Sequence, residues 1–202
     1  MVAKRDEWMS VEDFLAIDRE RLDQKYEFRN GQMVAMAGGS KHHAILIGNL
    51  YTIISSHLRG KPCYAFTSDM TLKIESEGYL PDIMVTCDKE DLDFAENKTY
   101  IEHPKLVIEV LSPSTEREDR GENFFTYTFC SSIQEYILVN YECMLVQKET
   151  RNGMQWVSTW SGKGETVELQ SIGLTIPVED IYDRIVLPPF DPFRGYKRRK
   201  KA

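Results

Sequence analysis

The sequence predicts an α/β protein: a mixed β-sheet flanked by helices, with extra strands near the C-terminus. The prediction rests on the chain order, in which short β-branched runs alternate with amphipathic helical segments, because such an order places helices on the faces of a sheet. The 202 residues, of which 42% are hydrophobic, can also bury a full core. We therefore expect residues 1–187 to form a single domain.

The N-terminal part is expected to form a helix and then a hairpin. Ser10 is a favourable N-cap and Asp13 stands at the capping-box position, so a helix should begin here. Strand-like runs at 25–29 and 32–36 flank the pair Asn30-Gly31. Both residues of this pair tolerate a positive φ, which favours a type I′ turn between two antiparallel strands.

A long amphipathic helix is expected from about residue 42 to residue 58, closed by Gly60. Its apolar positions recur at helical spacing: Ile45, Leu46, Leu50, Ile53, Ile54 and Leu58. This stripe would pack the helix against a sheet.

The rest of the chain is richer in strands. Strand candidates follow at 63–67, 70–74, 82–86, 105–111 and 135–139, and a hairpin is expected at 143–148 and 155–160. The polar break Ser112-Pro113-Ser114-Thr115 precedes a second helix, which should end near residue 130. A last short helix is expected at 178–182.

Composition limits the possible locations and partners. A net charge of −7 argues against a broadly basic protein that coats nucleic acid, although it is compatible with a local basic groove. No apolar stretch approaches the roughly 20 residues that span a bilayer, and the charged start has no apolar signal-peptide region behind it. We expect a cytoplasmic protein with no membrane contact.

The four cysteines are scattered and form no C-x-x-C pair: Cys63, Cys87, Cys130 and Cys143. This spacing predicts buried free thiols in a reducing cytoplasm and no zinc site. The C-terminal residues 188–202 are Pro-rich and then basic. Such a run either binds phosphates by electrostatics or, more commonly, forms a solvated and mobile tail.

Two carboxylates in apolar strand-like runs are the strongest indication of chemistry. Asp82 lies in the run 79–85 and Glu109 in the run 106–111. A buried carboxylate is costly unless it is paired, protonated or bound to a metal, so two of them suggest a site for a hard cation such as Mg²⁺. The alternative is that Asp82 caps a turn after Pro81 and that Glu109 pairs with an arginine.

Further polar residues can join these carboxylates. Glu27 lies in the first hairpin and His43 at the start of the long helix. Asp119, Asn123 and Tyr127 share one face of the second helix, which can overlook Glu109. Each has a structural alternative, because Glu27 could lie on a solvated strand face, His43 could cap a helix, and Tyr127 could serve only in packing.

These motifs resemble the Uma-two family of "putative restriction endonucleases", a branch of the PD-(D/E)xK nuclease superfamily. The resemblance covers roughly residues 8–185, and its most specific part is the segment 107–115 around Glu109; Leu80-Pro81-Asp82, Asp119-Arg120 and Glu135-Tyr136 also fit. It implies a four-stranded mixed core sheet flanked by helices, divalent-metal-dependent phosphodiester cleavage, and often a homodimer.

The resemblance also implies roles for individual residues. Asp82 and Glu109 match the metal-binding carboxylates, and Glu27 matches an acidic residue that often completes the site. The lysine of the family pattern Asp-Arg-x-x-Lys is replaced by Asn123, which carries no charge. The cations considered as substitutes are Arg117, Arg120 and Lys73.

Three functions follow as hypotheses. The first is an endonuclease that uses Mg²⁺ or Mn²⁺ to cleave DNA, with substrate contacts expected from His43, Lys73, Arg117, Asp119, Arg120 and Tyr127. The second is a protein that kept the nuclease fold but only binds nucleic acid or a partner. The third, a glycosidase with two carboxyl groups, fits poorly because such enzymes need no Pro-Asp strand motif. No organic cofactor is expected.

Overall fold

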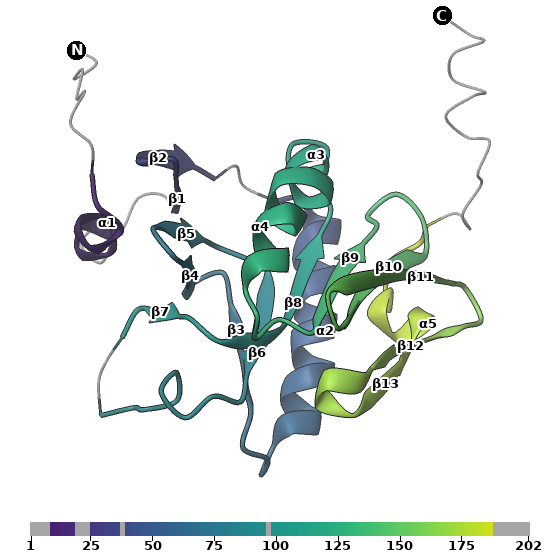
Figure 1. Cartoon of the computed structure of the whole chain (residues 1–202). Coiled ribbons are helices and arrows are strands. Elements are labelled where there is room, and N and C mark those ends of the chain that lie inside the picture. Colours follow the sequence, from purple (N-terminus) through teal and green to yellow (C-terminus); the bar gives the residue numbers. More distant parts are fainter. Residues whose placement is uncertain (1–8, 19–24, 37–38, 96–97, 188–202) are drawn as a thin grey trace, which may run out of the picture.

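A computed structural model describes residues 9–18, 25–36, 39–95 and 98–187 of the chain (Figure 1). The helical segments are α1 (Val11–Asp18), α2 (Lys41–Leu58), α3 (Glu116–Glu118), the π-helical turn η1 (Asp119–Asn123), α4 (Phe124–Phe129), the 3₁₀ turn η2 (Gln170–Ile172) and α5 (Val178–Ile181). The strands are β1 (Tyr26–Arg29), β2 (Gln32–Ala35), β3 (Tyr64–Thr67), β4 (Thr71–Ile74), β5 (Glu77–Tyr79), β6 (Ile83–Thr86), β7 (Tyr100–Ile101), β8 (Pro104–Val110), β9 (Glu135–Val139), β10 (Leu145–Asn152), β11 (Gln155–Gly162), β12 (Thr166–Leu169) and β13 (Leu174–Pro177).

The central element is a six-stranded mixed sheet with the order β11-β10-β9-β8-β6-β3. Strands β8 and β9 run parallel, and the other neighbours are antiparallel. The parallel pair needs a crossover, which the segment α3–η1–α4 provides by passing over one face of the sheet (Figure 1). The predicted mixed sheet with flanking helices is therefore confirmed.

Helices cover both faces of this sheet, because successive side chains of a strand point to opposite sides. On one side the apolar stripe of α2 packs against one set of alternate strand residues, together with α5: Leu46, Leu50, Ile54, Ile83, Val85, Leu106, Ile108, Ile137, Val139 and Ile181. On the other side α4 and β4 pack against the other set: Leu72, Met84, Val107, Leu111, Tyr127, Tyr136 and Leu138. Asp82 and Glu109 belong to this second face by the same alternation.

A five-stranded sheet, ordered β2-β1-β5-β4-β7, lies beside the central one and carries the predicted hairpin (Figure 1). Asn30 and Gly31 both have positive φ, 50° and 73°, as a type I′ turn requires. The predicted capping box is also present, since Asp13 N donates to Ser10 Oγ (3.1 Å) and Ser10 N to Asp13 Oδ2 (3.4 Å). Helix α1 closes this sheet by stacking Phe14 on Phe28.

The second predicted helix is not one regular α-helix. A π-helical turn, Asp119–Asn123, interrupts it between α3 and α4. The sequence pattern of 3.6 residues per turn cannot show such a change of pitch, which adds one residue to a turn and is frequent at functional sites. Asp119, Asn123 and Tyr127 are all buried, on the side that faces the sheet.

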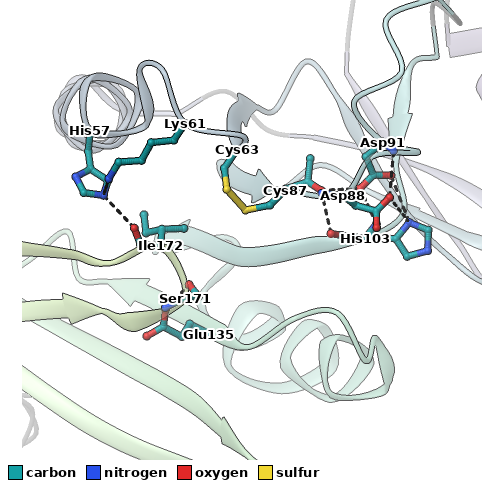
Figure 2. Close-up of a disulfide and its surroundings, with 11 residues drawn as sticks. His57, Lys61, Cys63, Cys87, Asp88, Asp91, His103, Glu135, Ser171 and Ile172 are labelled. Atoms are coloured by element: carbon teal, nitrogen blue, oxygen red, sulfur yellow. Dashed lines mark hydrogen bonds and ion pairs between the residues drawn. A yellow bond between two sulfur atoms is a disulfide. The ribbon is translucent and has the colours of Figure 1, made fainter.

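The prediction of four free thiols is wrong for one pair. Cys63 and Cys87 form a disulfide (Figure 2), whereas Cys130 and Cys143 are not disulfide-bonded. Strand β3 pairs antiparallel with β6, with Tyr64 opposite Thr86, and one further step of this register brings Cys63 opposite Cys87. The spacing of the cysteines along the chain carried no information about this pairing, which depends on strand register.

Two other predictions concern the ends and the membrane. In the described part of the chain, no helix is long and apolar enough to cross a bilayer. The predicted Pro-rich and basic tail, 188–202, lies outside the described residues.

Candidate active site

A cavity of about 420 Å³ lies between four parts of the fold. These are the β1–β2 hairpin, the start of α2, the adjoining start of β6 and end of β8, and the α3–η1 segment. The sequence-predicted residues among those that line it are Glu27, His43, Asp82, Glu109, Asp119 and Asn123. Segments far apart in the chain thus bring six of the predicted site residues to one place. Tyr127 lies directly behind the cavity, where its hydroxyl reaches Glu109.

The two strand carboxylates face each other across the antiparallel pair β6–β8. Ile83 is opposite Ile108, so Asp82 and Glu109 occupy the next position of the same register. Asp82 N donates to Glu109 Oε2 (3.1 Å), and Val110 N donates to Asp82 Oδ2 (2.8 Å). Both residues are buried. Backbone donors of the strands therefore fix the orientation of both carboxylates.

Glu109 is held in an apolar and acidic environment. Its other oxygen, Oε1, accepts a hydrogen bond from the hydroxyl of Tyr127 (3.2 Å). Burial, followed by the charges of Asp119 and Asp82, raises the pKa of Glu109 well above its ordinary value. The ionised form of Glu109 is consequently costly in the absence of a compensating positive charge.

Asp119 and Asn123 form a second polar pair in the π-helical turn. Asn123 Nδ2 donates to Asp119 Oδ1 (3.0 Å), while Asn123 Oδ1 is buried and has no partner among the described residues. Burial raises the pKa of Asp119 to about 6, and the charge of Asp82 adds to the effect. Asn123, which the family resemblance predicts to occupy the lysine position, is therefore buried at this cavity and is neutral.

His43 lies in the first turn of α2, where Ser40 Oγ accepts from its backbone N–H (3.3 Å). Its ring Nε2 is 3.2 Å from Asp82 Oδ2. The hydrogen bond to Asp82 raises the pKa of His43, and burial opposes this shift. The imidazole therefore lies at the cavity, in contact with one of the two strand carboxylates.

Glu27 lies on a buried part of β1 and not on a solvated strand face. Its Oε1 accepts from Leu80 N (3.0 Å), and its Oε2 pairs with the guanidinium of Arg29. Arg29 Nη1 also reaches Glu118 Oε2 (3.3 Å). Burial lowers the pKa of Arg29, but the neighbouring groups Glu27, Tyr127 and Glu118 together outweigh burial, so the pKa of Arg29 is raised.

The three cations predicted as substitutes for the lysine do not line the cavity. Lys73 Nζ pairs with Glu12 (3.5 Å) and Glu102 (3.4 Å) beside the five-stranded sheet. Arg120 pairs with Glu116 and Gln147 on the exposed side of the helix. Arg117 is exposed on α3.

The cavity holds more negative than positive groups. Its lining carboxylates are Glu27, Asp82, Glu109, Glu118 and Asp119, and its lining cationic side chains are Arg29 and His43. Such an excess of carboxylate oxygen suits a hard divalent cation, which prefers oxygen ligands. Asp82 and Glu109 are the pair best placed to hold one, because they lie side by side.

A second acidic group lies near the disulfide, where ligand atoms of Asp88, Asp91 and His103 come within 4.8 Å of one another (Figure 2). The Asp91 carboxylate already accepts hydrogen bonds from Thr86 Oγ1 (2.8 Å), Glu102 N (2.9 Å) and His103 N (2.9 Å). These bonds close the loop after β6, so the structure of the loop explains this group without an ion.

Arg29 is a charged cavity residue that the sequence did not predict as part of the site. Glu27 and Arg29 are two residues apart on one strand, so their side chains point to the same face. This spacing was visible in the sequence, but the charged neighbours Lys25 and Arg29 suggested a solvated face. Burial of the strand depends on α1 and β5, whose positions no local pattern predicts.

The chain is similar in sequence to known proteins. The sequence profile of the Uma2 family, described as "Putative restriction endonuclease", matches residues 11–179. The chain is 37% identical over 177 residues to the uncharacterised protein slr1290 of Synechocystis sp.. This match covers 86% of the chain and 91% of slr1290. The chain is 34% identical over 155 residues to the uncharacterised protein sll1609 of the same organism, covering 75% of this chain and 86% of that protein.

A solved structure has the same fold. The crystal structure of a "putative nuclease belonging to DUF820" from Anabaena variabilis matches with a TM-score of 0.69 over 86% of this chain and 97% of that one. The two sequences are 17% identical, so the likeness concerns the fold. It confirms the predicted restriction-endonuclease-like architecture.

Proposed function

Because the chain belongs to the Uma2 family of "putative restriction endonucleases", we propose that it is a divalent-metal-dependent endonuclease that hydrolyses phosphodiester bonds in DNA. The observation that carries this proposal is the pair Asp82 and Glu109, set opposite each other in a buried and acidic cavity. The glycosidase hypothesis has no comparable support.

Asp82 and Glu109 would hold Mg²⁺ or Mn²⁺. Bound there, such an ion supplies Lewis-acid polarisation of the phosphate and acidifies a bound water. The raised pKa of Glu109 supports this assignment, because the carboxylates that crowd it need a compensating positive charge. Tyr127 and the backbone N–H of Asp82 keep Glu109 in one orientation.

The other cavity residues orient the site. Asp119 and Asn123 form a hydrogen-bonded pair on the helical side, and His43 faces Asp82 from the start of α2. Asn123 Oδ1 has no described partner, so it can accept a hydrogen bond from a water molecule in the cavity. We assign these residues to positioning water and substrate.

A second candidate function is binding without cleavage. The observation that favours it is Asn123, since a neutral amide replaces the lysine of the family pattern. A charge aimed at the reacting phosphate is worth roughly 10²–10³ in rate. A protein without it could retain the metal site and bind nucleic acid without turnover.

Cleavage of supercoiled plasmid DNA in Mn²⁺ or Mg²⁺ separates the two functions. The endonuclease should convert it to nicked or linear DNA, and both EDTA and Glu109→Ala should abolish the reaction. Asp69→Ala is a matched control, because Asp69 is an exposed aspartate outside the cavity. DNA binding by the wild type with no cleavage, whether or not the binding needs the metal, would support the binding protein. Cleavage that survives in both Asp82→Ala and Glu109→Ala would place the chemistry elsewhere.

A further inference from the structure

The candidate site lacks the cation that its chemistry needs at the family's usual position. Asn123 occupies that position, and Lys73, Arg117 and Arg120 lie outside the cavity lining. Within the described residues that line the cavity, the basic side chains are Arg29 and His43. A replacement charge in the cavity lining should therefore come from this pair.

Arg29 is held at the cavity by contacts on several sides. Its guanidinium pairs with Glu27, reaches Glu118 at 3.3 Å, and lies 5.2 Å from the centre of the Tyr79 ring. Its side chain is 13% exposed. Because β1 is paired on both edges, with β2 and β5, the guanidinium projects from a fixed backbone.

Arg29 still has donors to offer. A guanidinium carries five N–H groups in a planar fork that matches the oxygens of a phosphate. The described contacts engage Nη1 and Nη2 with one carboxylate oxygen each, and the buried Nε has no described partner. The side chain is thus anchored without having all of its hydrogen-bonding capacity used.

We propose that Arg29 supplies, from strand β1, the positive charge that the missing lysine would have provided, by contacting the phosphate of bound DNA in the cavity. The inference rests on the proposed nuclease function. Arg29 is then a substrate-contacting residue. Glu27, whose two oxygens engage Leu80 N and Arg29, is a positioning residue that holds the guanidinium and not primarily a metal ligand.

His43 is the weaker candidate for this role. Its ring nitrogen contacts Asp82, a proposed metal ligand, so a bound ion competes for the same carboxylate. The imidazole is also charged only when protonated, whereas an arginine keeps its charge at every pH compatible with folding. A permanent charge is the closer chemical substitute for a lysine.

The test measures DNA binding separately from cleavage. A short fluorescein-labelled DNA duplex is titrated in Ca²⁺ at several NaCl concentrations, and a gel verifies that the duplex stays intact. Arg29→Gln should reduce the magnitude of the slope of log affinity against log salt concentration by about 1, as expected for the loss of one phosphate contact. Arg29→Lys should keep the slope, because it keeps the charge. Arg184→Gln is the control, since Arg184 is an exposed arginine outside the cavity.

Cleavage in Mn²⁺ gives the second readout. Arg29→Gln should lose about 10²–10³-fold in rate, and Arg29→Lys should lose much less. If Arg29→Gln folds poorly because Glu27 loses its partner, Glu27→Gln/Arg29→Gln removes both charges and should show the same loss of slope and rate. An unchanged slope and rate in a folded Arg29→Gln would overturn the proposal, as would equal defects in Arg29→Gln and Arg29→Lys.

Failure of the proposed function gives a different result. A wild type that neither binds the duplex nor cleaves plasmid would refute the nuclease function itself, and the role of Arg29 with it. A wild type that binds without cleaving refutes only turnover, and the salt slope then decides alone whether Arg29 contacts phosphate.

Discussion

The backbone N–H of Asp82 donates a 3.1 Å hydrogen bond to the carboxylate of Glu109, and the neighbouring N–H of Val110 returns a 2.8 Å bond to Asp82. Each carboxylate is therefore oriented by the strand that carries the other. Because both strands lie in the middle of the central sheet, this geometry does not depend on a mobile loop. Residues that the α3–η1 segment contributes to the site can therefore be substituted without displacing the two strand carboxylates.

Introduction of the family's lysine tests where the charge is needed. In Arg29→Gln, the further change Asn123→Lys should restore cleavage by about 10²–10³-fold, because it returns a charge to the cavity from the helical side. In the wild type the same change should have a small effect, since Arg29 already supplies a charge. Initial rates of plasmid nicking in Mn²⁺ measure both.

Rescue by Asn123→Lys supports the role of Arg29 only if the rescued cleavage still depends on the metal site. Glu109→Ala should abolish cleavage in the rescued protein. A large gain from Asn123→Lys in the wild type would instead indicate that Arg29 does not reach the phosphate. No cleavage by any of these proteins would favour the binding function.

The stability of the metal-free protein should depend on the pH through Asp119. Its pKa is raised from 3.8 to about 6, mainly by burial, so between these values the folded state holds a proton that the unfolded state has lost. The free energy of unfolding should therefore rise as the pH falls from about 6 to about 4, by up to about 1.4 kcal/mol per pH unit for one such group. The raised pKa of Glu109 acts in the same direction.

Urea unfolding in EDTA at several pH values checks this expectation. Asp119→Asn keeps an oxygen that can accept the bond from Asn123 but removes the titration. This variant should gain stability relative to the wild type near neutral pH, and the gain should shrink as the pH falls. A constant difference across the pH range would show that Asp119 does not titrate in this window.

The disulfide should stabilise the fold. Cys63 and Cys87 are 24 residues apart in the chain, and closing a loop of this length constrains the unfolded state by about 3 kcal/mol. Dithiothreitol should lower the urea midpoint of the wild type and leave that of Cys63→Ser/Cys87→Ser unchanged. Thiol titration of the denatured, unreduced protein should find two reactive thiols, those of Cys130 and Cys143. Four reactive thiols would contradict the pairing.

Much of the architecture could be predicted from local pattern. The capping box at Ser10, the Asn30-Gly31 turn, helix α2 and strand β9 all lie close to their predicted positions, because each depends on residues near in sequence. The Asp82 and Glu109 runs lie side by side as neighbouring antiparallel strands, which brings the two carboxylates together. The homodimer, the cytoplasmic location and the single domain over 1–187 stay predictions.

The missed features depend on contacts between distant segments. The π-helical turn at Asp119, the disulfide and the burial of Glu27 with Arg29 each require knowledge of strand register or helix pitch. Lys73 was considered as a substitute cation because it precedes Asp82 in the chain, yet its strand, β4, lies in the other sheet. Position in the sequence was a poor guide to distance from the site.

The central claim is that Asp82 and Glu109 form the metal site, and calorimetric titration of Mn²⁺ into the metal-free protein tests it most directly. The cluster of Asp88, Asp91 and His103 provides the internal control. We predict a binding isotherm for the wild type that persists in His103→Ala and disappears in Asp82→Ala and in Glu109→Ala. Binding that is lost in His103→Ala but kept in Asp82→Ala, or no binding to the wild type at all, would contradict the account.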